Sequence, residues 1–526
     1  MVVDGYGLKL EDVREVARRG AEVSVSQEAI DRVAHYRAVV DAAVAAGSVI
    51  YGLTTGLGRL CDVVVPAADA RDLQRNLILS HSTGVGEPLT PEEVRATLLL
   101  RVNALAQGHS GVRPVVIETL LGMLNRRVIP VIPRQGSVGA SGDLAPLAHL
   151  TLVAIGEGQA WAPDQPPGSP PLPGAEAMRR AGIEPLTLEA KEGLAMTNGT
   201  QVLTATLCLA LLDALLLLEA ATIAASLSLE ALRGVPSAFD ERVAAVRRHP
   251  GQLLVAAKVR ELTAGSRYLT RPGELRVQDA YSLRCVPQVH GAVSDVLSWV
   301  SGVVEREMNS TTDNPLVFLG ADGHSPAGDG GEVLSGGNFH GEPMAFAADF
   351  AGIAAAELAS MSERRTARLL DPASSAGLPA FLTSRGGLNS GLMLVQYTAA
   401  ALVSENKLLA SPASVDSIPT SAGQEDHVSM GSIAARKARD IVANAARVIA
   451  VELLAACQAI DLRGGLEGVA EPGGNPQALA EPLGQGTRRH YLTVRRLVPC
   501  VVEDRVLSGD VEKLAAALLR GDFRWT

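Results

Sequence analysis

Aromatic residues are scarce in this sequence: tryptophan, tyrosine and phenylalanine together make up 3% of the 526 residues. Sheet proteins depend on aromatic and β-branched side chains to cover their faces, so this scarcity disfavours a β-sandwich. The hydrophobic fraction is nevertheless 47%, and it is supplied mainly by alanine and leucine, which are strong helix formers. The composition therefore predicts a mainly helical protein with a large core and more than one structural region.

Paired cysteines and an excess of basic charge are also missing. The five cysteines form no Cys-x-x-Cys pair and have no histidine-rich neighbours, which predicts reduced thiols and neither a zinc site nor a disulfide framework. The formal net charge of -10 argues against a nucleic-acid partner, because such proteins need basic patches that displace counterions from phosphates. The first twenty residues contain no apolar segment of the secretory type. We therefore expect a cytoplasmic protein that acts on a small molecule.

One apolar run is long enough to cross a bilayer, namely residues 202–218. Asp213 interrupts the run and Glu219 follows it at once, so the sequence predicts a helix buried on all sides and no membrane partner. Residues 442–460 carry apolar side chains at steps of three and four, which predicts the core face of another long helix. Short strand-like runs within residues 315–337 predict a hairpin-like excursion.

The distribution of loops divides the chain at about residue 200. Glycine- and proline-rich turns are frequent before this point, and long helical patterns dominate after it. We expect residues 1–200 to form an N-terminal mixed α/β region and residues 201–526 to form a bundle of long helices.

The most informative segment is residues 136–150, GSVGASGDLAPLAHL, a glycine-rich loop that leads into an apolar helix with Asp143 as its expected cap. A dinucleotide fingerprint requires Gly-x-Gly-x-x-Gly directly after a buried strand, and the spacing here differs. A P-loop requires lysine after its last glycine, where Asp143 stands. Gly139 and Ser141 fit the first half of the serine-hydrolase Gly-x-Ser-x-Gly elbow, but Asp143 replaces the closing glycine. From this loop alone, a serine hydrolase and a non-catalytic helical scaffold both stay open.

The run Gly139-Ala140-Ser141-Gly142-Asp143 resembles the signature of the aromatic amino acid ammonia-lyases, in which an Ala-Ser-Gly tripeptide cyclises into a methylidene-imidazolone (MIO). Six further blocks resemble this family in the same order: YGLTTGLG at residue 51, NLILSHSTGVG at 76, EGLAMTNGTQ at 192, VQDAYSLRCVPQ at 277, SGGNFHGEP at 335 and TSAGQEDHVSM at 420. The resemblance covers most of the chain. It implies a mainly α fold, an electrophile made from the chain with no external cofactor and no metal, and a homotetramer with shared active sites.

Small residues suit this cyclisation. The amide nitrogen of Gly142 must reach the carbonyl carbon of Ala140 within one turn, and only residues with little or no side chain allow that approach. Ser141 then loses water and leaves an exocyclic methylidene. The residue types therefore agree with the chemistry that the resemblance implies.

The resemblance also implies roles for five further residues. Tyr51 matches the base that removes the β-proton of the substrate. Arg284 matches a clamp on the substrate carboxylate, for which a planar guanidinium is well suited. Tyr281, one turn before Arg284, matches a catalytic residue beside the electrophile. Asn198 and Gln278 match residues that hydrogen-bond substrate or cofactor.

Phe339 concerns the electrophile, and two places bear on the choice of substrate. Phe339 matches a ring that packs over the electrophile, with plain core packing as the alternative. The pair Ser80-His81 stands where phenylalanine and tyrosine enzymes carry Phe-Leu or His-Leu, and Glu425 stands where they carry glutamine. An imidazole ring needs polar partners once it is desolvated, whereas a phenyl ring would leave the Glu425 carboxylate unpaired. We therefore expect a reaction of histidine catabolism, the conversion of L-histidine to trans-urocanate and ammonia.

Four positions depart from the usual histidine-type blocks, and they bear on the substrate: Thr54, Leu57, Thr197 and Gly423. Thr54 is the residue that phenylalanine enzymes carry. The alternative is therefore a phenylalanine or tyrosine ammonia-lyase, or a tyrosine 2,3-aminomutase that uses the same electrophile.

Overall fold

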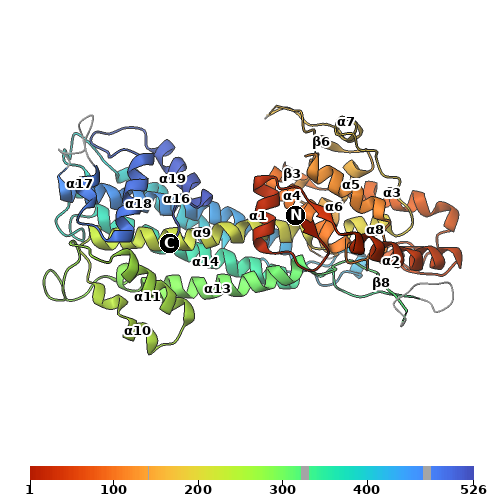
Figure 1. Ribbon diagram of the computed structural model, residues 1–526, viewed down its shortest axis with the longest axis horizontal. Helices are drawn as coiled ribbons and strands as arrows, with labels where there is room; N and C mark the ends of the chain where they lie inside the picture. Colours follow the sequence, from red (N-terminus) through yellow and green to blue (C-terminus); the bar gives the residue numbers. More distant parts are fainter. Residues whose placement is uncertain (140, 167, 321–330, 466–475, 526) are drawn as a thin grey trace. The chain divides into compact units, whose positions relative to one another are not determined.

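The structure is a computed structural model that describes residues 1–139, 141–166, 168–320, 331–465 and 476–525, and these residues are mostly helical (Figure 1). The prediction of a mainly α protein is confirmed. Ala140, the first residue of the expected electrophile, lies outside the described residues.

The chain forms two compact units. The first contains Met1–Leu209, Ser301–Asp349 and Pro412–Arg436, and the second contains Ala210–Val300, Phe350–Ser411 and Lys437–Thr526. Each unit joins segments that are distant in the sequence. The division at residue 200 expected from the sequence stays a prediction.

The first unit combines short and medium helices with very short strands. Its helices are α1 (Leu10–Arg19), α2 (Gln27–Ala45), α3 (Ala70–His81), α4 (Pro91–Leu105), α5 (Pro114–Asn125), α6 (Leu144–Ala154), α7 (Gly174–Arg180) and α8 (Glu192–Thr197). Its strands are β1 (Val2–Val3), β2 (Ser24–Val25), β3 (Val85–Pro88), β4 (Ile129–Pro130), β5 (Pro133–Gln135), β6 (Gln159–Trp161), β7 (Leu172–Pro173), β8 (Leu316–Phe318) and β9 (Glu332–Leu334). β1 pairs with β2 in parallel, while β3–β5, β4–β6–β7 and β8–β9 are antiparallel. The strands of the hairpin-like excursion predicted within residues 315–337 are confirmed by the pairing of β8 with β9, while its turn at residues 321–330 lies outside the described residues.

Helix α4 forms the centre of the first unit. Its start is fixed by a capping box, in which Thr90 Oγ1 accepts from the Glu93 backbone N–H (3.4 Å) and Glu93 Oε2 accepts from the Thr90 backbone N–H (2.9 Å). Every residue from Glu93 to Leu105 is buried, including Arg95 and Arg101. Because the helix is enclosed on all sides, its charged side chains must find their partners inside the protein.

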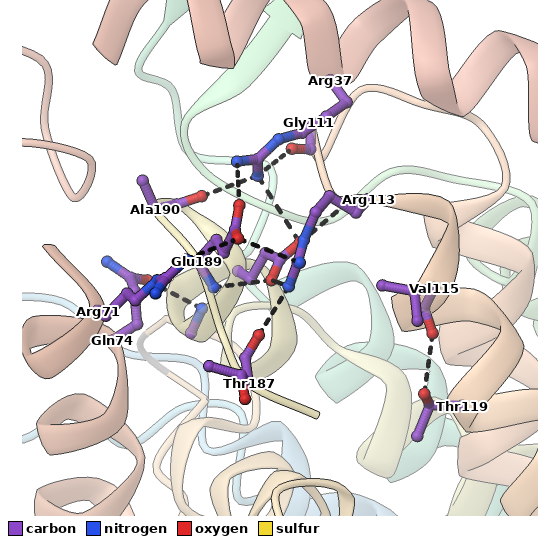
Figure 2. A network of polar contacts seen from close by, with 12 residues as sticks. Arg37, Arg71, Gln74, Gly111, Arg113, Val115, Thr119, Thr187, Glu189 and Ala190 are labelled. Carbon is purple, nitrogen blue, oxygen red and sulfur yellow. Dashed lines mark hydrogen bonds and ion pairs between the residues drawn. The ribbon is translucent and has the colours of Figure 1, made fainter. Parts of the chain in front are cut away.

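A network of arginines and carboxylates fixes the start of α8 (Figure 2). Glu192, whose side chain is fully buried, accepts from Arg113 Nε (2.8 Å) and Nη2 (2.7 Å). Glu189 lies 3.3 Å from Arg113 Nη1 and 3.6 Å from Arg37 Nη2. Gln74 Oε1 accepts from the Gly193 backbone N–H at 2.9 Å. These contacts hold the first turn of α8, and the residue that follows the end of this short helix is Asn198.

The second unit contains most residues of the long helices α9 (Gln201–Ala231), α13 (Val286–Met308), α14 (Glu342–Leu370) and α16 (Gly431–Gly464). Its other helices are α10 (Glu241–Ala245), α11 (Pro250–Leu262), α12 (Tyr281–Arg284), α15 (Met393–Leu409), α17 (Pro476–Ala480), α18 (Gln485–Leu497) and α19 (Ser508–Arg520).

The long helices lie side by side within the second unit (Figure 1). Arg365 of α14 and Glu452 of α16 form a fully buried ion pair of 2.6 Å, and Ser228 of α9 donates to the same carboxylate at 2.7 Å. Thr222 of α9 lies 3.0 Å from Nδ1 of His290 on α13. The apolar stripe predicted within residues 442–460 lies inside α16 and is buried, which confirms it as core.

Among the residues that the structure describes, two helices are apolar and long enough to cross a membrane. They are α9, whose most apolar window is 89% buried, and α14, whose window is 67% buried. Burial of this extent is typical of core helices. The prediction that residues 202–218 form a buried helix is confirmed.

Candidate active site

The backbone of the electrophile loop is paired with the segment after α8. The Asp143 backbone N–H donates to the carbonyl oxygen of Gly199 at 2.7 Å, and the Gly199 N–H donates to the carbonyl oxygen of Ser141 at 3.3 Å. Gly142, between these two bonds, has φ +72°, and a Cβ there would lie 2.1 Å from the Gly199 oxygen. Only glycine fits at position 142, which agrees with the small residues that a cyclising backbone requires.

The Asp143 carboxylate does not cap α6, although Asp143 stands at the N-cap position of this helix. It accepts instead from the Leu203 backbone N–H in the first turn of α9 (2.7 Å), from Ser432 Oγ (2.6 Å) and from Ser137 Oγ (3.3 Å). The expectation that this side chain caps α6 is therefore wrong, because the fully buried carboxylate is bound by donors distant in the sequence. Burial raises the pKa of Asp143 to about 6, while the donors from Ser432, Leu203 and Ser137 lower it.

Glu425 is held against the electrophile loop. Ser141 Oγ donates to Glu425 Oε1 at 3.1 Å, and Thr420 Oγ1 donates to Oε2 at 2.6 Å. The backbones of Thr420 and Glu425 also pair, across a turn in which Ser421 has φ +53° and Ala422 has φ +52°. The carboxylate is therefore fixed through both of its oxygens. Thr420 was missed by sequence reasoning.

The structure places five of the expected site residues around one cavity of about 560 Å³ in the first unit. They are Tyr51, Ser141, Asn198, Phe339 and Glu425. A smaller cavity of about 220 Å³ is lined by His81 together with Ser141, Gly142 and Glu425. Ser141 and Glu425 thus line both cavities, and the other expected residues of this unit lie around them.

Tyr51 points its phenol towards a tight, glycine-containing turn. Its hydroxyl oxygen accepts from the Gly58 backbone N–H at 3.4 Å. Gly52 has φ +68°, and a Cβ there would lie 2.4 Å from a Leu194 methyl group. Burial raises the pKa of Tyr51, the Gly58 N–H lowers it, and the Glu425 carboxylate raises it further. The phenol is therefore protonated at neutral pH.

His81 is the last residue of α3 and carries a neutral imidazole at pH 7. Burial lowers its pKa, while the Leu77 carbonyl and the Glu425 carboxylate raise it. Its Nδ1 lies 3.0 Å from Ser80 Oγ. The imidazole therefore has one nitrogen bound within the helix end, while the ring lines the smaller cavity with Glu425.

Asn198 contributes a polar group to the cavity that is not bound within the protein. Its side chain is 3% exposed, and Nδ2 donates to the Asn314 carbonyl oxygen at 3.1 Å. Among the described residues, its Oδ1 has no hydrogen-bond partner. A buried acceptor of this kind is suited to a ligand that donates.

Two histidines also line the larger cavity. His340 and His427 stack with ring centroids 5.5 Å apart, and the nearest nitrogens are 3.4 Å apart. Within the part of the chain that the structure describes, no group of three or more His, Cys, Asp or Glu side chains is arranged to hold a metal ion.

The other three expected site residues belong to the second unit and form a group of their own. Arg284 Nη1 donates to Gln278 Oε1 at 2.8 Å. The Arg284 guanidinium lies 4.8 Å from the centroid of the Tyr281 ring, so the two side chains face the same way, as expected from their spacing. Tyr281 is 71% exposed.

The four positions that depart from the histidine-type blocks, all of them described, do not line the larger cavity: Thr54, Leu57, Thr197 and Gly423. Thr54 Oγ1 donates to the Ser48 carbonyl oxygen at 2.7 Å, and Thr197 Oγ1 donates to the Gly193 carbonyl oxygen at 3.1 Å. These hydroxyls are satisfied by backbone and support the local fold. The departures therefore do not alter the polarity of the cavity wall.

Comparisons with known proteins agree with this site. The family described as aromatic amino acid lyase matches residues 8–495. A histidine ammonia-lyase of Caldanaerobacter subterraneus subsp. tengcongensis is 53% identical over 511 residues, which cover 97% of this chain and 95% of that relative. The solved histidine ammonia-lyase from Trypanosoma cruzi is 42% identical, with a TM-score of 0.87 and coverage of 99% and 94%. A solved tyrosine aminomutase from Streptomyces globisporus is 39% identical, with a TM-score of 0.89 and coverage of 99% and 97%. The chain belongs to the aromatic amino acid lyase family.

Proposed function

We propose that this protein eliminates ammonia from L-histidine to give trans-urocanate, using an electrophile formed from Ala140, Ser141 and Gly142. The observation that carries the proposal is the position of Glu425, whose carboxylate is bonded to Ser141 and lines the same cavity as His81. Family relatives named as histidine ammonia-lyases, such as the one that is 53% identical, support the same substrate.

The polarity around Ser141 favours an imidazole over a phenyl ring. Glu425 accepts hydrogen bonds, and neutral His81 can form one more hydrogen bond through the ring nitrogen that does not contact Ser80. An imidazole ring can pair with both groups, whereas a phenyl ring would desolvate the carboxylate without replacing its partners. Leaving buried polar groups unpaired is the strongest means by which a site rejects an analogue.

Formation of the electrophile needs only the chain itself. The amide nitrogen of Gly142 bonds to the carbonyl carbon of Ala140, and the carbonyl oxygen leaves as water with the hydrogens of the Gly142 and Ser141 amides. Ser141 then loses its hydroxyl and its Cα hydrogen as a second water, which leaves a carbon-carbon double bond. The left-handed backbone of Gly142 and its contact with Gly199 fit this closure.

In the proposed reaction the electrophile supplies a carbon that draws electrons from the substrate. Glu425 and His81 hold the substrate ring, and the free Oδ1 of Asn198 accepts from the substrate. Tyr51 takes the β-proton once its phenol is ionised, and Phe339, which lines the same cavity, packs over the electrophile. Arg284, which is hydrogen-bonded to Gln278, is the proposed clamp for the substrate carboxylate, and Tyr281 is a proposed catalytic residue.

Two other functions are compatible with the same electrophile. A phenylalanine or tyrosine ammonia-lyase needs no other loop chemistry, and the solved tyrosine aminomutase of 39% identity favours an aminomutase as the second candidate. A serine hydrolase is disfavoured, because the Ser141 hydroxyl is bonded to the Glu425 carboxylate and lacks a histidine base among the described residues.

We further propose a cytoplasmic homotetramer with active sites shared between subunits. Large apolar side chains exposed on the second unit support contact between copies: Leu394 is 55% exposed, Tyr397 58% and Leu408 75%. Light scattering coupled to size exclusion measures the number of subunits.

The proposed function is tested by mass and by turnover. A tryptic peptide that spans residues 139–143 is expected to weigh less than its sequence by two water molecules. The protein is expected to convert L-histidine to a product with urocanate absorbance, with at least about 100-fold lower kcat/KM on phenylalanine and tyrosine. An unmodified loop mass contradicts the electrophile, while a β-amino acid product identifies an aminomutase.

A further inference from the structure

A buried guanidinium lies behind the electrophile loop. Arg101 on α4 is 1% exposed, and its Nη1 donates to the carbonyl oxygen of Asn198 (2.8 Å) and to Gln201 Oε1 (2.6 Å). Gln201 Nε2 donates to Thr312 Oγ1 at 2.9 Å, and the Thr200 backbone N–H donates to the same oxygen at 3.3 Å. We call the side chains of Arg101, Gln201 and Thr312 the Arg101 cluster. All three are buried.

The Arg101 cluster packs against one side of Gly199, and the electrophile loop packs against the other. A Cβ on Gly199 would lie 2.4 Å from Gln201 Oε1, 2.7 Å from Arg101 Nη1 and 3.0 Å from Thr312 Oγ1. On the opposite side, a Cβ on Gly142 would meet the Gly199 oxygen at 2.1 Å. A methyl group therefore fits at neither glycine, and the Gly199 backbone lies in close contact with both the cluster and the loop.

Burying the charged guanidinium of Arg101 carries a large desolvation penalty. Burial lowers the pKa of Arg101 to about 10, while Asp313 raises it, so the side chain is a cation at neutral pH. Asp313 itself is 2.8 Å from Lys191, and both of these side chains are buried. Nε and Nη2 of Arg101 have no hydrogen-bond partner among the described residues. An apolar side chain would fill this space with a smaller desolvation penalty. We therefore attribute the presence of the guanidinium to its hydrogen bonds with the Asn198 carbonyl and Gln201.

We propose that Arg101 is a positioning residue for closure of the electrophile, an inference that rests on the proposed function. Arg101 fixes the carbonyl of Asn198, and Gln201 is fixed with it. The Gly199 backbone then holds the Ser141 carbonyl and the Asp143 N–H in place. The amide nitrogen of Gly142 lies between these two anchored peptide groups. Limiting the motion of the Gly142 nitrogen before it bonds to the Ala140 carbonyl carbon is a proximity effect, and such effects accelerate ring closure.

The experiment compares two arginines of the same helix. Arg101→Met removes the donor to Asn198 and Gln201, and Arg101→Lys keeps one cationic donor. The matched control is Arg95→Met: Arg95 is 8% exposed and donates to the carbonyl oxygens of Val16 and Leu124, which do not contact the loop. The readout is the fraction of the loop peptide that lacks two waters, measured by mass on folded full-length protein.

We expect Arg101→Met to lower the modified fraction at least about twofold, with partial rescue in Arg101→Lys and a wild-type fraction in Arg95→Met. Full modification in folded Arg101→Met overturns the inference. If that variant does not fold, Arg101→Gln replaces it, because it removes the guanidinium and keeps a polar side chain; full modification there overturns the inference equally. An unmodified loop in the wild-type protein refutes the proposed function instead, so the two failures are distinguishable.

Discussion

Ser141 and Glu425 are 284 positions apart in the chain, and the Ser141 hydroxyl donates to Glu425 Oε1 at 3.1 Å. This bond brings the loop expected to form the electrophile to the residue expected to select the substrate. Formation of the electrophile removes the Ser141 hydroxyl as water, so Glu425 Oε1 is then available to contact a bound amino acid. The residue proposed to form the electrophile and the residue proposed to select the substrate are therefore direct neighbours.

Replacing Glu425 tests the specificity. Glu425→Gln keeps the size of the side chain and removes its charge, so we expect kcat/KM on L-histidine to fall by at least about 100-fold while the loop still loses two waters. Asp426→Asn is the control, because Asp426 lines the same cavity and carries the same charge. Turnover measured by urocanate absorbance decides between them. Equal losses in the two variants would show that the charge of the cavity, and not the position of Glu425, matters.

Thr420 is expected to act through Glu425. Thr420→Val removes the 2.6 Å hydrogen bond to Oε2 at constant volume, which costs about 1–2 kcal/mol and corresponds to a fall of about 5- to 30-fold in kcat/KM on histidine. Thr420→Ser keeps the hydroxyl and is expected to stay within about threefold of wild type. Steady-state kinetics on both variants measures the difference. A wild-type rate in Thr420→Val contradicts the role.

Much of the fold was predictable from the sequence because apolar side chains at steps of three or four define a helix face locally. The core stripe of α16 and the buried run of α9 are examples. The side-chain contacts around the site were harder to predict from the sequence. Thr420 reaches Glu425 only because Ser421 and Ala422 adopt φ above +50°, and neither residue type signals a left-handed backbone.

The second failure of sequence reasoning has a different cause. Asp143 precedes an apolar helix, and a local rule makes it the cap of that helix. The bonds that it forms go to Leu203 and Ser432, which only the tertiary fold brings near. Arg101 was invisible for the same reason, since its role depends on segments about a hundred residues away.

Gly142 should tolerate no side chain. Gly142→Ala puts a methyl group 2.1 Å from the Gly199 oxygen in a residue with φ +72°, so we expect it to lower the free energy of unfolding by about 2–4 kcal/mol and to abolish the loop mass deficit. Gly47→Ala is the control, because Gly47 has φ +66° and nothing within 4 Å of its added Cβ. Gly47→Ala therefore measures the effect of backbone strain alone, which we expect to lower the free energy of unfolding by about 1 kcal/mol. Denaturant unfolding and peptide mass give both readouts.

The Asp143 carboxyl predicts a pH dependence of stability. Its folded pKa of about 6 exceeds its ordinary value of 3.8, so the folded state holds this proton more tightly than the unfolded chain does. The stabilisation is complete below about pH 4 and is lost as the pH rises through 6, a change on the order of 3 kcal/mol. Asp143→Asn removes this titration. The difference in Tm between wild type and variant should therefore change between pH 4 and pH 7, and a constant difference would contradict the buried acid.

The raised pKa of Tyr51 determines the direction in which turnover changes with pH. A phenol that is protonated at neutral pH can accept the β-proton only in the fraction of molecules that has ionised, and this fraction grows as the pH rises towards the pKa. We therefore expect kcat/KM on L-histidine to increase with pH across the neutral range.

Tyr51→Phe keeps the ring and loses the proton acceptor, so the rate should fall by about 100-fold or more and the rise with pH should disappear. Tyr36→Phe is the control, because burial raises the pKa of Tyr36 as well and this residue does not line the cavity. The loop mass must stay two waters short in both variants, since electrophile formation does not involve the phenol. Full turnover in Tyr51→Phe with an intact electrophile would assign the proton transfer to another group. If Tyr51→Phe lowers the rate but the rate still rises with pH, Tyr51 would instead be a residue that holds the substrate. The rate depends on the ionisation of Tyr51 only if Tyr51 is the proton acceptor.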